Sequence, residues 1–286
     1  MTICPEQLRK ALHHVWPSAS LPALPDLPQQ LNLITDSRKL TEGDVFVAVP
    51  GSQRDGREYI EQALASDASL VLAHTKESDV RLEGQVLFLP HLSLRLGELG
   101  RTLFDVPSGL EIIAVTGTNG KSSVTHYIAE LSEQLGTAAG VIGTLGVGRP
   151  GKLLESGLTT PGPLALQATL GELARQGVKR VALEASSHAL DQQRLDAVNV
   201  NVGVFTNLTR DHLDYHGSMA AYAAAKAKLF RRTELALAVV NGDDPLARLM
   251  LAGCDENVRV LATGSDEAVT LRVLDWQPHA LGQQAL

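Results

Sequence analysis

The segment from residue 111 to residue 135 constrains the fold of this chain most strongly. The apolar run EIIAVTG (111–117) is typical of a β-strand, and a helix is expected from about Ser122 to Leu135. Between them lies the turn Gly117-Thr118-Asn119-Gly120-Lys121-Ser122-Ser123. A strand that passes through a glycine-rich turn into a helix is the context that a phosphate-binding loop requires. The segment therefore predicts an α/β domain built on a mostly parallel sheet.

The turn has the chemistry to hold the phosphates of a nucleotide. Its successive backbone N–H groups can point at an anion, and the helix N-terminus adds partial positive charge. We expect Lys121 to neutralise phosphate charge and the Ser122 hydroxyl to ligate Mg²⁺. The usual spacing, G-x-x-x-x-G-K-S/T, would place a glycine where this chain has Val115. The alternative is an ordinary strand-to-helix turn that carries a surface lysine.

The rest of the chain alternates strand-like and helix-like segments in two parts. At roughly 150 residues per domain, 286 residues make about two domains. The stretch DVPSG (105–109) breaks the pattern, so we place an N-terminal domain at 1–107 and a central domain at 108–286. Strands are expected at 31–35, 45–49, 69–74, 86–90, 111–117, 137–144, 180–186, 201–207, 234–241, 258–263 and 269–276. Helices are expected at 5–15, 57–66, 92–104, 163–176, 218–230 and 244–251, with a Gly- and Pro-rich loop between 144 and 161. The fold class is thus α/β, with a small N-terminal domain before a mostly parallel central one.

Composition excludes several classes of protein. Lys and Arg total 25 and Asp and Glu total 32, and a net charge of −7 does not suit a nucleic-acid-binding protein. The two cysteines, Cys4 and Cys254, make neither a metal-ligand spacing nor a disulfide framework. No apolar run approaches the roughly 20 residues of a membrane span, and the start, MTICPEQLRK, has no apolar signal core. We expect a soluble cytoplasmic protein.

Polar clusters follow several of the predicted strands. In open α/β sheets this carboxyl edge is where ligands bind. Glu184 ends the strand 180–186 and could hold Mg²⁺ or cap the next helix. His212 lies in the loop after the strand 201–207 and could ligate a metal or be an ordinary loop histidine. Taken alone, Lys226 is a solvated helix lysine, and Thr159 and Thr160 are helix N-caps.

Taken in order, these motifs resemble the Mur ligase family. They are TGTNGKSS, GLTTPG, EASSHALDQQR, FTNLTRDHLDYHG and AAKAKLF, and the segment TDSRKLTEGDVFVAVPGSQRDGREYI is similar to the family's UDP-sugar-binding domain. The resemblance implies an ATP-dependent amide-bond ligase of peptidoglycan synthesis. It would add the third amino acid, with meso-diaminopimelate favoured, to UDP-MurNAc-L-Ala-D-Glu by way of an acyl phosphate. The D-Ala-D-Ala-adding ligase fits the later motifs less well, and folylpolyglutamate synthetases share only the central ATP chemistry.

The resemblance also implies a role for each matching residue. ATP would bind along Gly117 to Ser123, and the catalytic set would be Lys121, Glu184, His212 and Lys226. Ser122 and Glu184 would hold one Mg²⁺ and His212 would help to hold a second. Lys226 would be carried as a carbamate and serve as a further metal ligand. The UDP-sugar would contact Thr35, Ser37, Ser52, Gln53 and Arg54, and the muramoyl-peptide end would contact Thr159, Thr160, Ser186, Gln192 and Arg194.

The family has a third domain that grips the incoming amino acid, and we find no counterpart of it in these 286 residues. The last residues, QPHALGQQAL, are typical of a strand turning into a hairpin whose partner is missing. We therefore expect the chain to stop inside its central domain, to be a monomer and to be inactive alone. Three alternatives stay open: an L-lysine-adding ligase of the same family, a nucleotide-binding fragment without turnover, and a phosphate-loop motor protein. A motor has no need of the predicted UDP-sugar contacts.

Overall fold

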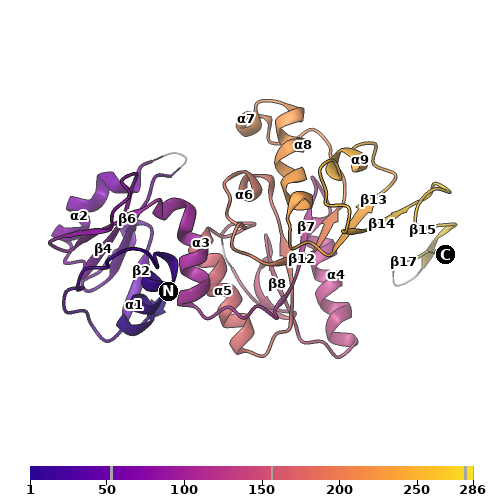
Figure 1. Cartoon of the computed structure of the whole chain (residues 1–286). Coiled ribbons are helices and arrows are strands. Elements are labelled where there is room, and N and C mark those ends of the chain that lie inside the picture. Colours follow the sequence, from indigo (N-terminus) through magenta and orange to yellow (C-terminus); the bar gives the residue numbers. More distant parts are fainter. Residues whose placement is uncertain (52–53, 156, 280–281, 286) are drawn as a thin grey trace. The chain divides into compact units, whose positions relative to one another are not determined.

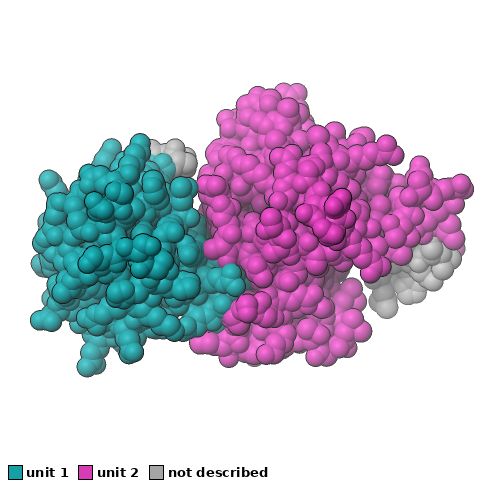
Figure 2. Space-filling view, in the orientation of Figure 1, with its two compact units in different colours: residues 1–106, 163–171 teal, residues 107–162, 172–286 magenta. Residues whose placement is uncertain are grey.

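The computed structural model describes residues 1–51, 54–155, 157–279 and 282–285. The chain divides into two compact units (Figure 2): unit 1 contains residues 1–106 and 163–171, and unit 2 contains residues 107–162 and 172–286. Both units are α/β structures, which confirms the predicted fold class. The sequence analysis did not anticipate that residues 163–171 pack with the N-terminal part. The domain limits 1–107 and 108–286 remain predictions.

Unit 1 is built on a six-stranded sheet (Figure 1) with the strand order β1-β2-β3-β4-β6-β5. The four central strands are parallel, and β1 and β5 are antiparallel to their neighbours. The strands are β1 (Thr2–Ile3), β2 (Leu31–Ile34), β3 (Val45–Ala48), β4 (Leu70–Thr75), β5 (Arg81–Glu83) and β6 (Val86–Pro90). The helices are α1 (Pro5–Val15), α2 (Ile60–Ala65) and α3 (Leu92–Leu103), with 3₁₀ turns at Ser37–Lys39 and Gly56–Tyr59.

Both faces of this sheet are buried at β3, and all four residues of that strand are apolar. Along β3, Val45 and Val47 join the core formed with α1 and α3, whereas Phe46 and Ala48 join a second core with α2. This alternation follows from the two-residue repeat of a strand. A parallel sheet covered on two sides explains why the sequence shows short apolar runs instead of alternating polarity.

Unit 2 is built on a nine-stranded sheet with the order β10-β9-β8-β11-β7-β12-β13-β14-β15. All neighbours from β8 to β15 are parallel, and β9 and β10 are antiparallel additions. The strands are β7 (Glu111–Thr116), β8 (Ala139–Gly143), β9 (Gly146–Arg149), β10 (Lys152–Leu154), β11 (Arg180–Glu184), β12 (Val200–Phe205), β13 (Leu237–Asn241), β14 (Arg259–Gly264) and β15 (Leu271–Arg272). The helices are α4 (Lys121–Gln134), α6 (Ser187–Asp191), α7 (Leu213–His216), α8 (Met219–Ala227) and α9 (Ala247–Met250), with a 3₁₀ turn at Lys228–Arg231. The helix α5 (Pro163–Arg175) belongs to unit 1 up to Gly171 and to unit 2 from Glu172. A separate two-stranded sheet pairs β16 (Trp276–His279) with β17 (Gly282–Ala285).

Helices cover this sheet on opposite faces. Ala129 of α4 packs with Ala139 and Val141 of β8. Gly203 of β12 lies on the other face, close to Phe230 of the 3₁₀ turn. The central strand β7 lies between β11 and β12, so the carboxyl ends of these three strands come together. That edge is where an α/β sheet binds its ligands.

The predicted loop after residue 144 is in part a hairpin, because β9 and β10 extend the sheet beyond β8. The glycines of this hairpin make it hard to recognise from the sequence. Gly146 has φ +126°, and a Cβ there would lie 2.6 Å from the Leu154 carbonyl oxygen. A glycine-rich strand therefore looks like a turn when it is read by composition. The predicted helix 244–251 shortens to α9, and the predicted strand 269–276 is split between β15 and β16.

Within the described part of the chain, none of the helices combines the length and the apolar character needed to span a bilayer.

Candidate functional site

The loop after β7 has a backbone that only glycine can follow at two positions. Gly117 has φ +148°, and a Cβ on it would lie 1.9 Å from Thr206 Oγ1. Gly120 has φ +82° and directly precedes α4. The first turn of a helix has amide N–H groups without intrahelical partners, and α4 begins at Lys121 with Ser122 and Ser123 in that turn. The predicted loop is therefore a tight bend that ends in a helix N-terminus.

The loop after β12 holds this bend in place. Asn207 accepts a hydrogen bond from the Thr118 N–H on its carbonyl at 2.8 Å and one from the Asn119 N–H on its side-chain Oδ1 at 3.0 Å. Thr206 Oγ1 donates to the Asn119 carbonyl at 2.7 Å. The two N–H groups in the middle of the bend are thus engaged by protein. An anion would therefore bind to the backbone N–H groups of the following residues, in the first turn of α4.

Two lysines from distant parts of the chain meet at this loop. Lys121 Nζ donates to the carbonyls of Gly117 at 3.0 Å and Thr118 at 2.8 Å. Lys226 Nζ, from α8, donates to the same Gly117 carbonyl at 2.7 Å and lies 4.6 Å from the centre of the Tyr222 ring. Lys226 is buried, with 1% of its surface exposed. It is therefore not the solvated helix lysine that its position alone suggests.

Burial changes the proton affinity of both amines. Desolvation lowers the pKa of Lys121, while Glu184 and Asp211 oppose that shift. For Lys226, burial lowers the pKa to about 7, the positive charge of Lys121 lowers it further, and Asp211 opposes the shift. Two amines with lowered pKa values therefore share the Gly117 carbonyl, and the pKa of Lys226 lies near neutrality.

Glu184 is buried at the carboxyl end of β11. Its Oε1 accepts from the Thr144 N–H at 2.9 Å, and its Oε2 accepts from the Thr144 hydroxyl at 3.2 Å. The carboxylate takes the space that a side chain at Gly143 would need, since a Cβ there would lie 2.2 Å from Glu184 Oε1. Thr144 Oγ1 also lies 2.9 Å from Thr159 Oγ1. Thr144 was not singled out in the sequence, although it directly follows β8 at the same edge of the sheet.

The residues predicted to meet the muramoyl-peptide end lie next to Glu184. Thr160 Oγ1 donates to the Glu184 carbonyl at 2.7 Å and accepts from the Ser186 N–H at 3.1 Å. Arg194 Nη1 donates to the Thr160 carbonyl at 2.7 Å. Gln192 Oε1 accepts from Arg194 Nε at 3.0 Å. The structure thus brings this predicted set together, while the roles of its members stay predictions.

His212 lies in an aromatic cluster with His188, Tyr215, His216 and Tyr222. The His212 ring is 4.9 Å from that of His188 and 6.1 Å from that of Tyr222. Burial lowers the pKa of His188, and His212 and His216 lower it further. A neutral imidazole can accept a hydrogen bond or ligate a metal.

The predicted metal ligands do not form a ready-made cage. In the parts of the chain that the structure describes, no three His, Cys, Asp or Glu residues are placed to hold a metal ion. Mg²⁺, however, usually binds through one or two carboxylates together with substrate phosphates. The buried carboxylate of Glu184 and the hydroxyl of Ser122 are oxygen donors of that kind, beside a loop suited to phosphate. The residues present therefore fit Mg²⁺ that arrives with a nucleotide, and His212 and Lys226 as ligands remain predictions.

Unit 1 has a cleft of ≈ 480 Å³. Its lining includes three predicted UDP-sugar residues, Thr35, Ser37 and Arg54. Arg54 Nη1 donates to the Tyr59 hydroxyl at 3.4 Å, and the guanidinium of Arg38 holds the pKa of Asp36 down to about 2. Ser52 and Gln53, also predicted to contact this ligand, lie outside the described residues. The sequence analysis gave no individual role to Asp36, Arg38 or Tyr59.

Comparisons with known proteins identify the family of this chain. The family model "Mur ligase middle domain" matches residues 115–285, and the model "Mur ligase family, catalytic domain" matches residues 32–99. The UDP-N-acetylmuramoyl-L-alanyl-D-glutamate–2,6-diaminopimelate ligase of Coxiella burnetii is 45% identical over 223 residues, which are 77% of this chain and 46% of that protein. The enzyme of the same name from Pseudomonas aeruginosa is 46% identical over 233 residues, 80% of this chain and 47% of that protein. The chain thus spans about half the length of the curated relatives it matches.

Solved structures show the same likeness. One of a UDP-N-acetylmuramoyl-L-alanyl-D-glutamate–2,6-diaminopimelate ligase superposes with a TM-score of 0.78 at 34% identity, over 96% of this chain and 56% of that one. MurF from Acinetobacter baumannii shares the fold, with a TM-score of 0.65 at 18% identity over 100% of this chain and 60% of its own. Because one family model matches more than half of the residues, the chain belongs to the Mur ligase family.

Proposed function

We propose that this chain forms the ATP-binding and UDP-sugar-binding parts of a ligase of peptidoglycan synthesis. The reaction would join UDP-MurNAc-L-Ala-D-Glu to meso-diaminopimelate through an amide bond. The names of relatives at 45–46% identity support this pair of substrates over the L-lysine alternative. The site residues support the chemistry.

The observation that carries the proposal is the meeting of Lys121 and Lys226 at the Gly117 carbonyl, with Glu184 close enough to act on Lys121. Bound Mg²⁺–ATP would supply the phosphoryl group that activates the substrate carboxylate. Lys121 can release its two loop carbonyls and offset negative charge on the phosphates, where a fixed cation stabilises the transferring group. Thr144 holds both oxygens of Glu184, so this carboxylate has a set orientation at the sheet edge.

Arg194 is the residue best suited to the substrate's own carboxylate. Its guanidinium is half-buried and is anchored to the Thr160 carbonyl and to Gln192. A planar guanidinium can donate two parallel hydrogen bonds to a carboxylate, as the D-Glu end of the substrate requires. The UDP end would occupy the unit 1 cleft that Thr35, Ser37 and Arg54 line.

Two measurements on the 286-residue chain test the proposal. Calorimetry should show binding of UDP-MurNAc-L-Ala-D-Glu and of a non-hydrolysable ATP analogue with Mg²⁺. Because these 286 residues span about half the length of the curated relatives, we expect no detectable phosphate release with meso-diaminopimelate or L-lysine.

Failure to bind the UDP-sugar at millimolar concentration, by a chain shown to be folded, would contradict the assignment of Thr35, Ser37 and Arg54. Robust phosphate release that depends on either amino acid would contradict the expected inactivity. An Arg54→Ala variant should weaken binding of the UDP-sugar and leave the ATP analogue unaffected, which separates the two sites.

A further inference from the structure

A continuous line of hydrogen bonds ends at Arg194. Lys228 Nζ lies 2.8 Å from Asp191 Oδ1, and the Tyr215 hydroxyl lies 3.2 Å from Asp191 Oδ2. The same hydroxyl lies 3.1 Å from Gln192 Nε2. Gln192 Oε1 then lies 3.0 Å from Arg194 Nε and 2.6 Å from Arg194 Nη2. The line joins residues of α6, α7 and the 3₁₀ turn after α8 to an arginine in the proposed substrate site.

The charge on Asp191 sets the direction of every bond in this line. The Lys228 ammonium holds the pKa of Asp191 below its usual value, so the carboxylate is ionised at neutral pH and can only accept. Tyr215 must therefore donate its one hydrogen to Asp191. Its oxygen is left to accept from the amide nitrogen of Gln192.

The orientation of the Gln192 amide follows from that bond. With Nε2 turned towards Tyr215, Oε1 faces Arg194 and accepts from two of its nitrogens. A third nitrogen, Nη1, donates to the Thr160 carbonyl. Guanidinium has five N–H groups, so these three contacts leave one N–H on each terminal nitrogen. Such a pair is the donor set for one carboxylate.

We propose that Tyr215 is a positioning residue that aims Arg194 at the carboxylate of the substrate by fixing the amide of Gln192. The identity of that carboxylate, the D-Glu end of the UDP-sugar, rests on the proposed function. Without the hydroxyl, Gln192 Nε2 loses this acceptor, and the amide is then held only through Oε1 by Arg194. The Tyr215 ring is 4.2 Å from the His188 ring and 4.7 Å from the His216 ring. Tyr215→Phe keeps these ring contacts and removes the hydroxyl alone.

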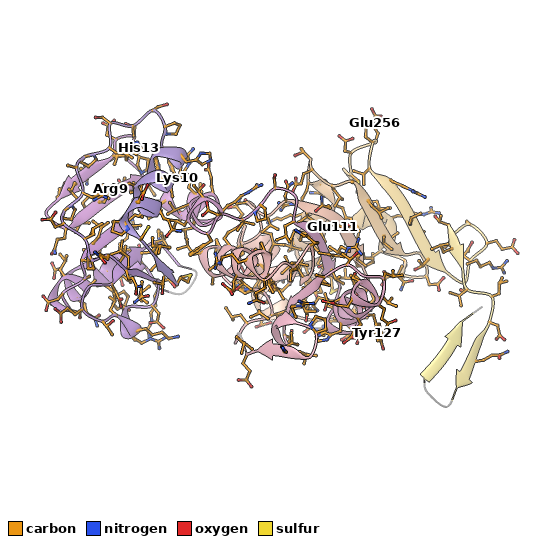
Figure 3. The ribbon with its side chains drawn as sticks, turned by 90° about the horizontal axis from the view of Figure 1, so that it is seen from below. Arg9, Lys10, His13, Glu111, Tyr127 and Glu256 are labelled. Carbon is orange, nitrogen blue, oxygen red and sulfur yellow. The ribbon has the colours of Figure 1, made fainter. Side chains whose placement is uncertain are left out.

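The first test needs no substrate. Solvent exchange of the Arg194 Nε–H, assigned by its loss in Arg194→Lys, is measured by NMR in the wild type and in Tyr215→Phe. Loss of a hydrogen bond of ordinary strength should accelerate exchange about fivefold to tenfold. The matched control is Tyr127→Phe, because Tyr127 is 67% exposed on α4 (Figure 3) and outside this line. An unchanged exchange rate in Tyr215→Phe would overturn the proposal whatever the protein binds.

The second test measures binding to the 286-residue chain by calorimetry. Tyr215→Phe should lower the affinity for UDP-MurNAc-L-Ala-D-Glu about fivefold to tenfold. The affinity for UDP alone should not change, because UDP lacks the carboxylate. In a Gln192→Ala background the same substitution should have no further effect, since the coupling passes through that amide. Equal losses in both backgrounds would indicate a merely structural tyrosine and overturn the proposal. If the wild type binds neither ligand, the proposed function fails, and the exchange measurement still decides the role of Tyr215.

Discussion

Lys226 should react with dissolved CO₂ at a mildly alkaline pH at which ordinary lysines do not. Carbamate formation needs the neutral amine, whose lone pair attacks the carbon of CO₂ while one proton leaves to solvent. With a pKa of about 7, instead of the usual 10.5, roughly nine-tenths of Lys226 is neutral at pH 8. An ordinary lysine is about 0.3% neutral at that pH, so the reactive fraction is roughly 300-fold larger.

The surroundings of Lys226 also favour the product. The charge of Lys121, which lowers the pKa of the neighbouring amine, would attract the carbamate anion. The lowered pKa reflects a penalty on the protonated amine. The fraction of Lys226 present as carbamate should therefore rise as the pH increases through 7, and it should be small at pH values below 7.

The assay is ¹³C NMR of the chain in buffer equilibrated with ¹³CO₂ between pH 6 and pH 9. We expect one carbamate resonance that disappears in Lys226→Ala and persists in Lys179→Ala, a matched control at an exposed lysine. A spectrum at pH 8 without a signal that depends on Lys226 would refute the reasoning from burial. A signal that persists in Lys226→Ala would assign the reaction to another amine.

Three further predictions concern the loop and the core. Lys121→Ala should lower turnover at least about a hundredfold in an active form of the ligase, and near-normal turnover would contradict its assignment to the phosphate site. Gly117→Ala should lower the free energy of unfolding by about 3 kcal/mol because of its contact with Thr206. Gly136→Ala, also at positive φ but with nothing within 4 Å of the added Cβ, should cost only about 1 kcal/mol in urea titrations; equal losses would argue against the contact. Gln167→Met should raise the unfolding free energy by about 1 kcal/mol, because both polar atoms of the buried Gln167 lack a partner within the described structure. A lower melting temperature would show that this amide is satisfied.

The sequence alone was sufficient for the features that depend on neighbours in the chain. A buried strand, two glycines and a helix start in succession predict the bend at Gly117–Lys121, because backbone conformation and helix ends are local properties. The alternating strands and helices predict an α/β fold for the same reason. The β9–β10 hairpin was missed because its glycines carry no side-chain pattern. Glycine is present there because the two backbones lie too close together for a Cβ atom.

Resemblance to a family indicated Lys226 and Arg194, and the residue pattern around them did not. Taken alone, Lys226 is one lysine in an Ala-rich helix, and nothing in that pattern places it on a carbonyl 109 residues earlier in the chain. The partners that orient the site, Thr144 for Glu184 and Tyr215 for Gln192, lie 40 and 23 residues away. Only the tertiary packing of strands, helices and loops brings such groups within hydrogen-bond distance.

The protonation of the site is likewise decided by tertiary structure. Composition yields a net charge of −7 but not the state of any one amine. Lys226 loses its proton near pH 7 because α8 buries it beside a second cation. Desolvation depends on the atoms that surround a group in space, and sequence neighbours supply only a few of them. The local sequence thus determined where a phosphate loop could form, and the tertiary structure decided which distant groups would meet there and in what charge state.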